Sequence, residues 1–325
     1  TSVPAIYTCT IQYPGDANHT AAVSPAFTYS SNPAATTTAL KASVASLFYG
    51  LPVTLTATVS SALAPSTPRT GLVTFYDAGV AVGTAPLDGA STATFPVTAP
   101  GVGTHYYTAA YSSDLLFKAS TSAAKSVTVK KATVKVTLLP VAGPVVPGQP
   151  VTLAANVLVT AGINTPTGTV TFKEGSKTLG SATLDDTGAA TLPFAFTTAG
   201  THALTVTYAG DLQTAAASSP AVKVVVAKAG TQIAFTAPDA SLTRGTATTF
   251  TIQLTPVAPA TQTPTGKVLL KDGTKTLATL TLANGQAQWT TPTTLTIGLH
   301  ALTAAYQGDA NDLGIMSDVF DLTVV

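Results

Sequence analysis

Three histidines, His105, His202 and His300, are the first residues of this chain that could do chemistry. Histidine can serve as a general acid or base, or as a metal ligand. The three are 97 and 98 residues apart, at the same place in a recurring segment. Because a metal ion needs ligands within a few ångströms of one another, residues this far apart in a periodic chain cannot share one. We expect each histidine to make a structural hydrogen bond at the start of a strand.

Four aspartates, each at a turn, raise the possibility of calcium binding. The richest set of oxygens is Asp309, Asn311 and Asp312. Calcium takes about six to eight oxygen ligands, and the corresponding turns elsewhere lack the extra oxygens. We therefore favour a structural, turn-capping role for all four and keep calcium at the last turn as the alternative; the four are Asp16, Asp114, Asp211 and Asp309.

Other catalytic arrangements are missing from the sequence. Glu174 is the one glutamate, so no pair of glutamates could flank a sugar bond, and no aspartate pair is marked out for that role either. Neither a Gly-x-Ser-x-Gly elbow nor a glycine-rich phosphate loop occurs. We expect no enzyme activity and no cofactor.

Two single residues have alternative interpretations. Cys9, the one cysteine, falls on the predicted buried face of its strand, which favours a buried unpaired thiol over an intermolecular disulfide. Trp289, the one tryptophan, aligns with Leu192, which favours core packing over a sugar-binding platform.

The charge balance excludes several partners. The net charge is +1, charged residues make up only 9% of the chain, and no basic run occurs. Nucleic acid and anionic membrane surfaces are therefore not expected partners. No apolar run is long enough to span a bilayer.

The elements that position these residues follow from a long repeat. The aspartates above are separated by 98, 97 and 98 residues, which indicates tandem copies of one domain. Before each aspartate, apolar residues alternate with polar or small ones, the pattern of a strand with one buried face. A tyrosine ends this strand in each copy, and we expect its ring to be buried, with its hydroxyl bonded near the following turn; these tyrosines are Tyr13, Tyr111, Tyr208 and Tyr306.

The period predicts the domain boundaries. Short strands separated by turn residues, without capped helical segments, indicate an all-β fold of tandem immunoglobulin-like β-sandwiches. Short junctions between copies favour arrangement as a rod. The expected divisions are a partial repeat and linker at 1–34, then domains at 35–130, 131–227 and 228–325.

The recurring segments resemble bacterial immunoglobulin-like repeat domains of secreted and surface proteins, including adhesins. The resemblance rests on segments such as Gly168–Phe172, on the Asp-Gly turns, and on the Tyr-x-Gly-Asp motif that ends at Asp211 and Asp309. It covers nearly all of the chain from Thr38 onward. Ser113 departs from it, because glycine is expected there, and the turn could differ in shape. The resemblance implies an extracellular or cell-surface location and no fixed active site.

The first 31 residues match only the last two strands of the repeat, with predicted strands at 5–13 and 21–29. An isolated two-stranded hairpin is marginal in water, and its open edges invite another chain. Either the chain is a section of a longer protein with flanking repeats, or the hairpin completes or extends a sheet in another copy, giving a head-to-tail homopolymer. The residues expected to carry this assembly are Tyr7, Cys9, Ile11, Tyr13, Phe27 and Tyr29.

Three functions remain after these exclusions. The first is structural: a non-catalytic stalk, or a subunit of a surface filament joined by strand complementation. The second is an adhesin segment that binds glycan or protein through its loops. The third, an accessory module of a secreted enzyme, is the least favoured.

Overall fold

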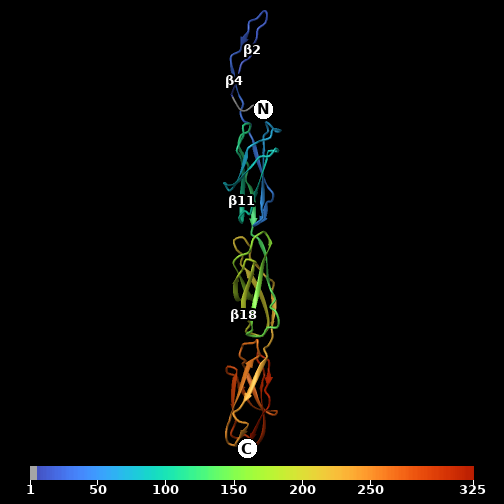
Figure 1. Ribbon diagram of the computed structural model, residues 1–325, viewed down its shortest axis with the longest axis vertical. Coiled ribbons are helices and arrows are strands. Elements are labelled where there is room, and N and C mark those ends of the chain that lie inside the picture. The colour runs from blue at the N-terminus through green and yellow to red at the C-terminus, as the bar shows by residue number, and fades with distance from the viewer. Residues whose placement is uncertain (1–5) are drawn as a thin grey trace. The chain divides into compact units, whose positions relative to one another are not determined.

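The computed structural model describes residues 6–325, and every regular element in this part of the chain is a β-strand. This confirms the all-β prediction. Figure 1 shows the strands as successive groups of arrows that follow the chain from blue to red. Within residues 6–325 we find no helix with the length and apolar character needed to cross a membrane. Ala5, the first residue of one predicted strand, lies outside the described residues.

The N-terminal hairpin, residues 6–30, consists of two short antiparallel pairs. The outer pair is β1–β4 and the inner pair β2–β3. Pro25 separates β3 from β4 within the single strand predicted at 21–29, because proline has no N–H to offer to a ladder. The four strands are β1 (Ile6–Cys9), β2 (Gln12–Tyr13), β3 (Ala22–Val23) and β4 (Phe27–Ser30).

The first full repeat is a sandwich of two sheets. One sheet has the order β10-β7-β5 and the other the order β6-β13-β11-β8-β9, with β12 also pairing with β11. Its strands are β5 (Thr37–Ala42), β6 (Ser46–Phe48), β7 (Val53–Ser60), β8 (Leu72–Asp77), β9 (Val80–Pro86), β10 (Thr92–Val97), β11 (Gly103–Tyr111), β12 (Ser120–Thr121) and β13 (Lys125–Lys130).

The second repeat has the same design. Its sheets have the orders β14-β15-β18 and β17-β16-β19-β20, and β21 also pairs with β19. Its strands are β14 (Thr133–Leu138), β15 (Pro150–Ala161), β16 (Thr169–Glu174), β17 (Lys177–Thr183), β18 (Ala189–Ala195), β19 (Gly200–Tyr208), β20 (Ala217–Ser218) and β21 (Val222–Val226).

The third repeat follows the same plan. Its sheets have the orders β22-β24-β27 and β23-β30-β28-β25-β26, and β29 also pairs with β28. Its strands are β22 (Thr231–Thr236), β23 (Ser241–Leu242), β24 (Thr249–Pro256), β25 (Lys267–Asp272), β26 (Lys275–Thr281), β27 (Gln286–Thr290), β28 (Gly298–Tyr306), β29 (Ile315–Met316) and β30 (Phe320–Val324).

The core of each sandwich comes from alternate residues of facing strands. In the first repeat, Leu55 of β7, Phe75 of β8 and Tyr107 of β11 are fully buried in one cluster. The register between the central strands is the same in every copy: the terminal tyrosine lies opposite a valine, as Tyr111 does opposite Val73. The sequence period is thus reproduced residue by residue in the pairing.

By its contacts the chain forms two compact units. The first unit holds the chain up to Val134 with the segments Val159–Pro166 and Gly210–Ala216. The second holds Lys135–Leu158, Thr167–Ala209 and Ala217–Val325. The domain boundaries and the rod arrangement given above stay predictions.

Candidate functional site

Each of the repeat histidines binds a carboxylate on the neighbouring strand. The distances from histidine Nδ1 to the carboxylate are 2.6 Å for His105 and Asp77, 2.7 Å for His202 and Glu174, and 2.7 Å for His300 and Asp272. The other ring nitrogen faces a loop carbonyl, that of Gly101, Thr198 or Thr296. The pairs therefore tie the start of β11, β19 or β28 both to the neighbouring strand and to the loop before it.

A histidine–carboxylate pair also occurs in catalytic sites, where the second ring nitrogen faces a nucleophile or a metal. Here that nitrogen faces a carbonyl, which can only accept a hydrogen bond. Burial lowers the pKa of His105, but its hydrogen bonds to Asp77 and to the Gly101 carbonyl together raise the pKa above its usual value. The pKa of His300 is raised by the Thr296 carbonyl and by Asp272. The geometry favours a charged structural pair.

The turn aspartates cap the loops that follow β11, β19 and β28. Asp309 Oδ1 accepts from the backbone N–H groups of Asn311 at 2.7 Å and Asp312 at 2.8 Å. Its Oδ2 accepts from the N–H of Thr265 at 3.1 Å and from the hydroxyl of the same residue at 2.5 Å. These bonds bring the pKa of Asp309 down to about 2, although burial opposes them. Asp114 makes the same set of bonds in the first repeat.

This geometry bears on the calcium alternative at Asp309, Asn311 and Asp312. Both Asp309 oxygens point at hydrogen-bond donors, and the Lys228 ammonium donates to the Asp309 backbone carbonyl. Asn311 uses its side-chain amide to bond Ala199 and Thr197. The Asp309 carboxylate and the Asn311 amide oxygen, which calcium would need, already accept from N–H and O–H groups. Among residues 6–325 there is no cluster of three or more His, Cys, Asp or Glu side chains suited to a metal.

Asp312, which the sequence marked only as a possible calcium ligand, is the buried acid of the last turn. The residue is only 2% exposed. Burial first, and then the charge of Asp309, raise the pKa of Asp312 to about 6, while Lys228 opposes the shift. Thr214 and Phe117 occupy the same position in the second and first repeats and are also buried. The position favours a neutral side chain.

The tyrosines that end β11, β19 and β28 are Tyr111, Tyr208 and Tyr306, and all three are buried. The Tyr208 hydroxyl donates to the carbonyl of Thr167 at 2.9 Å, in the loop before β16. Burial, and with it the adjacent turn aspartate, raises the pKa of Tyr111 and of Tyr306. Asp114 and Asp309, in the turns that follow, are the groups that act on the Tyr111 and Tyr306 hydroxyls, and the hydrogen bonds expected there stay a prediction.

The N-terminal hairpin reverses the burial seen at the same positions in the complete repeats. Ile11 is 69% exposed, whereas its counterpart Ala109 is fully buried. Tyr13 is 43% exposed, against 1% for Tyr111. The prediction of a buried Cys9 is wrong, because its thiol is exposed and free. Within residues 6–325 no second sheet covers this face, so its side chains stay exposed.

The hairpin nevertheless has the turn of a complete repeat. Asp16 Oδ1 accepts from the N–H of Asn18 at 2.8 Å, and Oδ2 accepts from the Tyr13 hydroxyl at 2.8 Å. The Asn18 bond, with those of Tyr13 and His19, lowers the pKa of Asp16 to about 2. The loop is therefore formed, while the apolar face of the strands beside it is open.

That apolar face is made of aligned side chains. Tyr7 lies opposite Tyr29 and Cys9 opposite Phe27 in the β1–β4 ladder, so the four share one side of the hairpin. The Tyr7 and Tyr29 rings are 6.4 Å apart. The other two residues predicted to carry assembly lie nearer the turn of the hairpin: Tyr13 is in β2, and Ile11 directly precedes that strand.

The acids that bind the histidines were not predicted from the sequence. A signal was present: the acid precedes its histidine by 28 residues in every repeat. A fixed separation between two polar residues in each copy indicates a pair that the fold brings together.

Trp289 is half-buried and packs on the Phe250 ring at 5.7 Å.

Comparison with known proteins gives one clear match. A family model of the bacterial Ig-like domain (group 3) matches residues 38–130, 138–227 and 235–325. No curated protein matches the chain.

Several solved structures are similar in part. Invasin, a bacterial integrin-binding protein, shares 16% identity over 89% of this chain and 60% of its own, with a TM-score of 0.43. The Escherichia coli adhesin FdeC shares 14% identity over 89% of this chain and 96% of its own, with a TM-score of 0.32. The titin I-band fragment I67–I69 shares 12% identity over 89% of this chain and 98% of its own, with a TM-score of 0.35. At these values the likenesses carry no argument about function.

Proposed function

This chain belongs to the bacterial Ig-like domain (group 3) family, and we propose that it is a non-catalytic, extracellular structural segment that self-associates through its N-terminal hairpin. The hairpin, which corresponds to the last two strands of a repeat, adds to a sheet of a neighbouring copy at the cell surface. The observation that carries the proposal is the open apolar face of Tyr7, Cys9, Phe27 and Tyr29.

The physical argument is that this face has the chemistry of a core. An apolar side chain that moves from water into a packed interior stabilises the assembly by about 1.5–3 kcal/mol when fully buried. In the complete repeats, the strand equivalent to β1 and β2 pairs with β8, β16 or β25. Among the described residues, β1 and β2 have no such neighbour. Strand addition from a second copy would satisfy both the open backbone edge and the apolar face.

Deletion of residues 1–31 tests the proposal. The intact chain should form species of increasing mass as its concentration rises, whereas the deleted chain should stay a folded monomer. Sedimentation velocity measures the masses, electron microscopy shows the assemblies, and far-UV circular dichroism checks that the sandwiches remain folded.

A pair of matched variants separates the apolar face from the hairpin itself. Phe27→Ser with Tyr29→Ser removes apolar groups from the proposed contact face and should weaken association. Thr28→Ala with Ser30→Ala alters the opposite face of β4 and should leave association unchanged. An intact chain that stays monomeric, or a deleted chain that still assembles, would refute the proposal.

A further inference from the structure

The line along which an edge strand of one sheet meets an edge strand of the other, here called the seam, differs among the repeats. In the first repeat, β5 lies at the edge of one sheet and β12 at the edge of the other. The Thr38 hydroxyl lies 2.7 Å from that of Ser120, and the Thr36 hydroxyl donates to the same oxygen at 2.7 Å. In the second repeat, Val136 fills the position of Thr38 and is only 2% exposed. Thr38 and Val136 are therefore both buried at this position.

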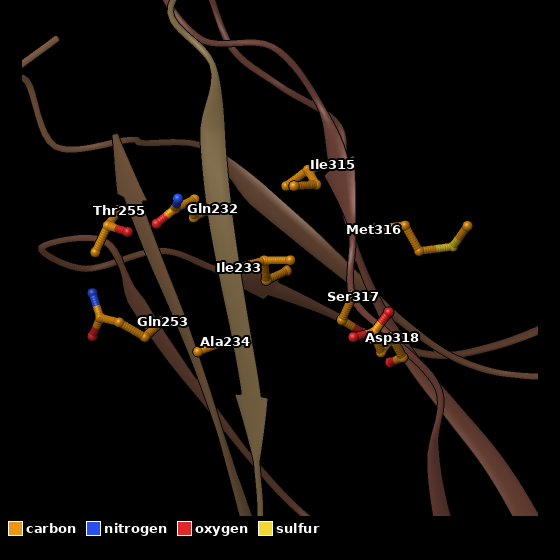
Figure 2. Close-up of a pocket in the computed structure, with 9 residues that line it drawn as sticks. All are labelled: Gln232, Ile233, Ala234, Gln253, Thr255, Ile315, Met316, Ser317 and Asp318. Carbon is orange, nitrogen blue, oxygen red and sulfur yellow. Dashed lines mark hydrogen bonds between the residues drawn. The ribbon is translucent and has the colours of Figure 1, made fainter. Parts of the chain in front are cut away.

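In the third repeat the same two positions are Ile233 of β22 and Ile315 of β29, whose hydrocarbon side chains cannot form the hydrogen bonds of the first seam. Both side chains are partly exposed at the edge of the core. A groove of about 480 Å³ opens between them. Figure 2 shows the segment of β22 on one side of this groove and Ile315 and Met316 on the other.

The lining of the groove combines an apolar floor with polar groups. Met316, adjacent to Ile315, is 62% exposed, which leaves a large apolar side chain in water. The polar groups include the amides of Gln232 and Gln253 (Figure 2). This seam is therefore an apolar slot with hydrogen-bonding groups along it, the character of a site for an extended polypeptide.

The backbone of β22 adds to the slot. This strand pairs with β24 along one edge and stands at the end of its sheet, so its other edge has no strand partner among residues 6–325. An edge strand presents a row of free N–H and C=O groups to an incoming strand. In the part of the chain that the structure describes, the N-terminal hairpin has the same two properties: an edge without a strand partner, and an apolar face made of Tyr7, Cys9, Phe27 and Tyr29.

We propose that the groove between β22 and β29 receives the N-terminal hairpin of a second copy of this chain. The hairpin aligns with the free edge of β22 and places its apolar face over Ile233, Ile315 and Met316. The inference rests on the proposed function, because it names the acceptor for the hairpin-mediated association.

The first test introduces, at the groove of the third repeat, the residue types that the first repeat has at the same two positions. Ile233→Thr with Ile315→Ser copies Thr38 and Ser120 of the first repeat. This double variant should remain folded by circular dichroism and lose at least tenfold in association constant by sedimentation velocity. The control, Val136→Thr with Ala217→Ser, makes the same residues in the second repeat and should associate as the unaltered chain does.

The second test uses Cys9, which lies on the docking face and is the one cysteine of the chain. The unaltered chain is mixed with Cys9→Ser/Met316→Cys and oxidised. A disulfide-linked heterodimer should form faster than with the control Cys9→Ser/Leu212→Cys, although the new thiol of the control is on a more exposed turn of the second repeat. Mass spectrometry of the linked peptides identifies the partner thiols.

The outcomes separate the two proposals. Association can require the hairpin and yet be unchanged in the Ile233→Thr/Ile315→Ser variant, with no preferred disulfide at position 316. That result overturns this acceptor and leaves the proposed function standing. Absence of association in the intact chain overturns both. Loss of association in the closed variant, together with the preferred disulfide, supports this acceptor.

Discussion

At the residue scale, the polar side chains of this protein act mainly on its own backbone. Asp114 and Asp309 use both carboxylate oxygens on turn N–H and threonine groups. The histidines bridge a carboxylate and a loop carbonyl. Residues that could do chemistry in another setting are here engaged in positioning loops, which agrees with a structural role.

Asp312 carries a prediction about pH. The pKa of Asp312 in the folded state is about 6, above the ordinary value of 3.8. Between these two pH values the folded state therefore holds a proton that the unfolded state has released. The contribution of Asp312 to stability is therefore present below the ordinary pKa and is lost as the pH rises through the folded pKa. Asp309 and Lys228 are the charged groups that face it.

Asp312→Thr introduces the residue type that the second repeat has at this position, Thr214. This change should remove the loss of folding stability at higher pH. We expect the variant to be more stable than the unaltered chain above pH 6 by about 1–2 kcal/mol, allowing for screening by solvent. Urea unfolding followed across this pH range measures the difference, and Asp312→Asn should behave alike. Parallel stability–pH curves for the unaltered and variant chains would show that Asp312 does not titrate as described.

At the scale of elements, the turn after β11 tests how strictly the repeat requires glycine. Ser113 has φ of 90°, close to the 84° of Gly210 and the 79° of Gly308. The turn therefore keeps its shape, and serine adopts a left-handed conformation that L-residues disfavour. The expectation of a different turn shape at Ser113 is wrong.

Ser113→Gly should consequently stabilise the first repeat by about 0.5–1 kcal/mol, since the relief of strain exceeds the added freedom of the unfolded chain. The reverse change, Gly210→Ser, should destabilise the second repeat, because a Cβ there would lie 2.8 Å from the Thr214 carbonyl oxygen. Thermal unfolding of both variants measures the two effects. A stabilising Gly210→Ser would mean that the turn relaxes freely and that strain is not the cause.

Much of the strand order could be predicted from the sequence. The alternation before Tyr208 and the fixed period indicate the central strands, since one face must be buried in every copy. The chain after β11 pairs with it as two separate strands, β12 and β13, because the Ser122 hydroxyl between them accepts from the N–H of Ala109. Strands β5 and β6 were not predicted, because their apolar residues are few and adjacent polar residues obscure the period.

The hairpin and the groove show what a sequence pattern leaves open. Alternation indicates which face of β1 is apolar, but the exposure of Cys9 depends on whether a second sheet is present. The groove arises where Ile233 and Ile315 replace a hydrogen-bonded pair, and its opening depends on how two sheet edges meet. Such edges involve residues more than 80 positions apart, beyond the reach of local patterns.

At the scale of the whole molecule, the proposals assign each copy one donor and one acceptor. The donor is the hairpin at residues 6–30, and the acceptor is the groove in the third repeat. Because the two surfaces differ, the contact is heterologous, and copies joined in this way continue to add unless the ring closes. Charged residues make up only 9% of this chain. Its copies would then form an extended array through one small contact that is repeated from copy to copy.

The most direct test of this account is hydrogen–deuterium exchange of residues 6–30 over a wide range of protein concentration. The account predicts that amides of β1 and β4 exchange more slowly as the concentration rises, because a second copy covers their open edges. The buried central strands β11, β19 and β28 should exchange equally slowly throughout and serve as the internal reference. Exchange of residues 6–30 that is the same at every concentration would contradict the claim that another copy completes the hairpin.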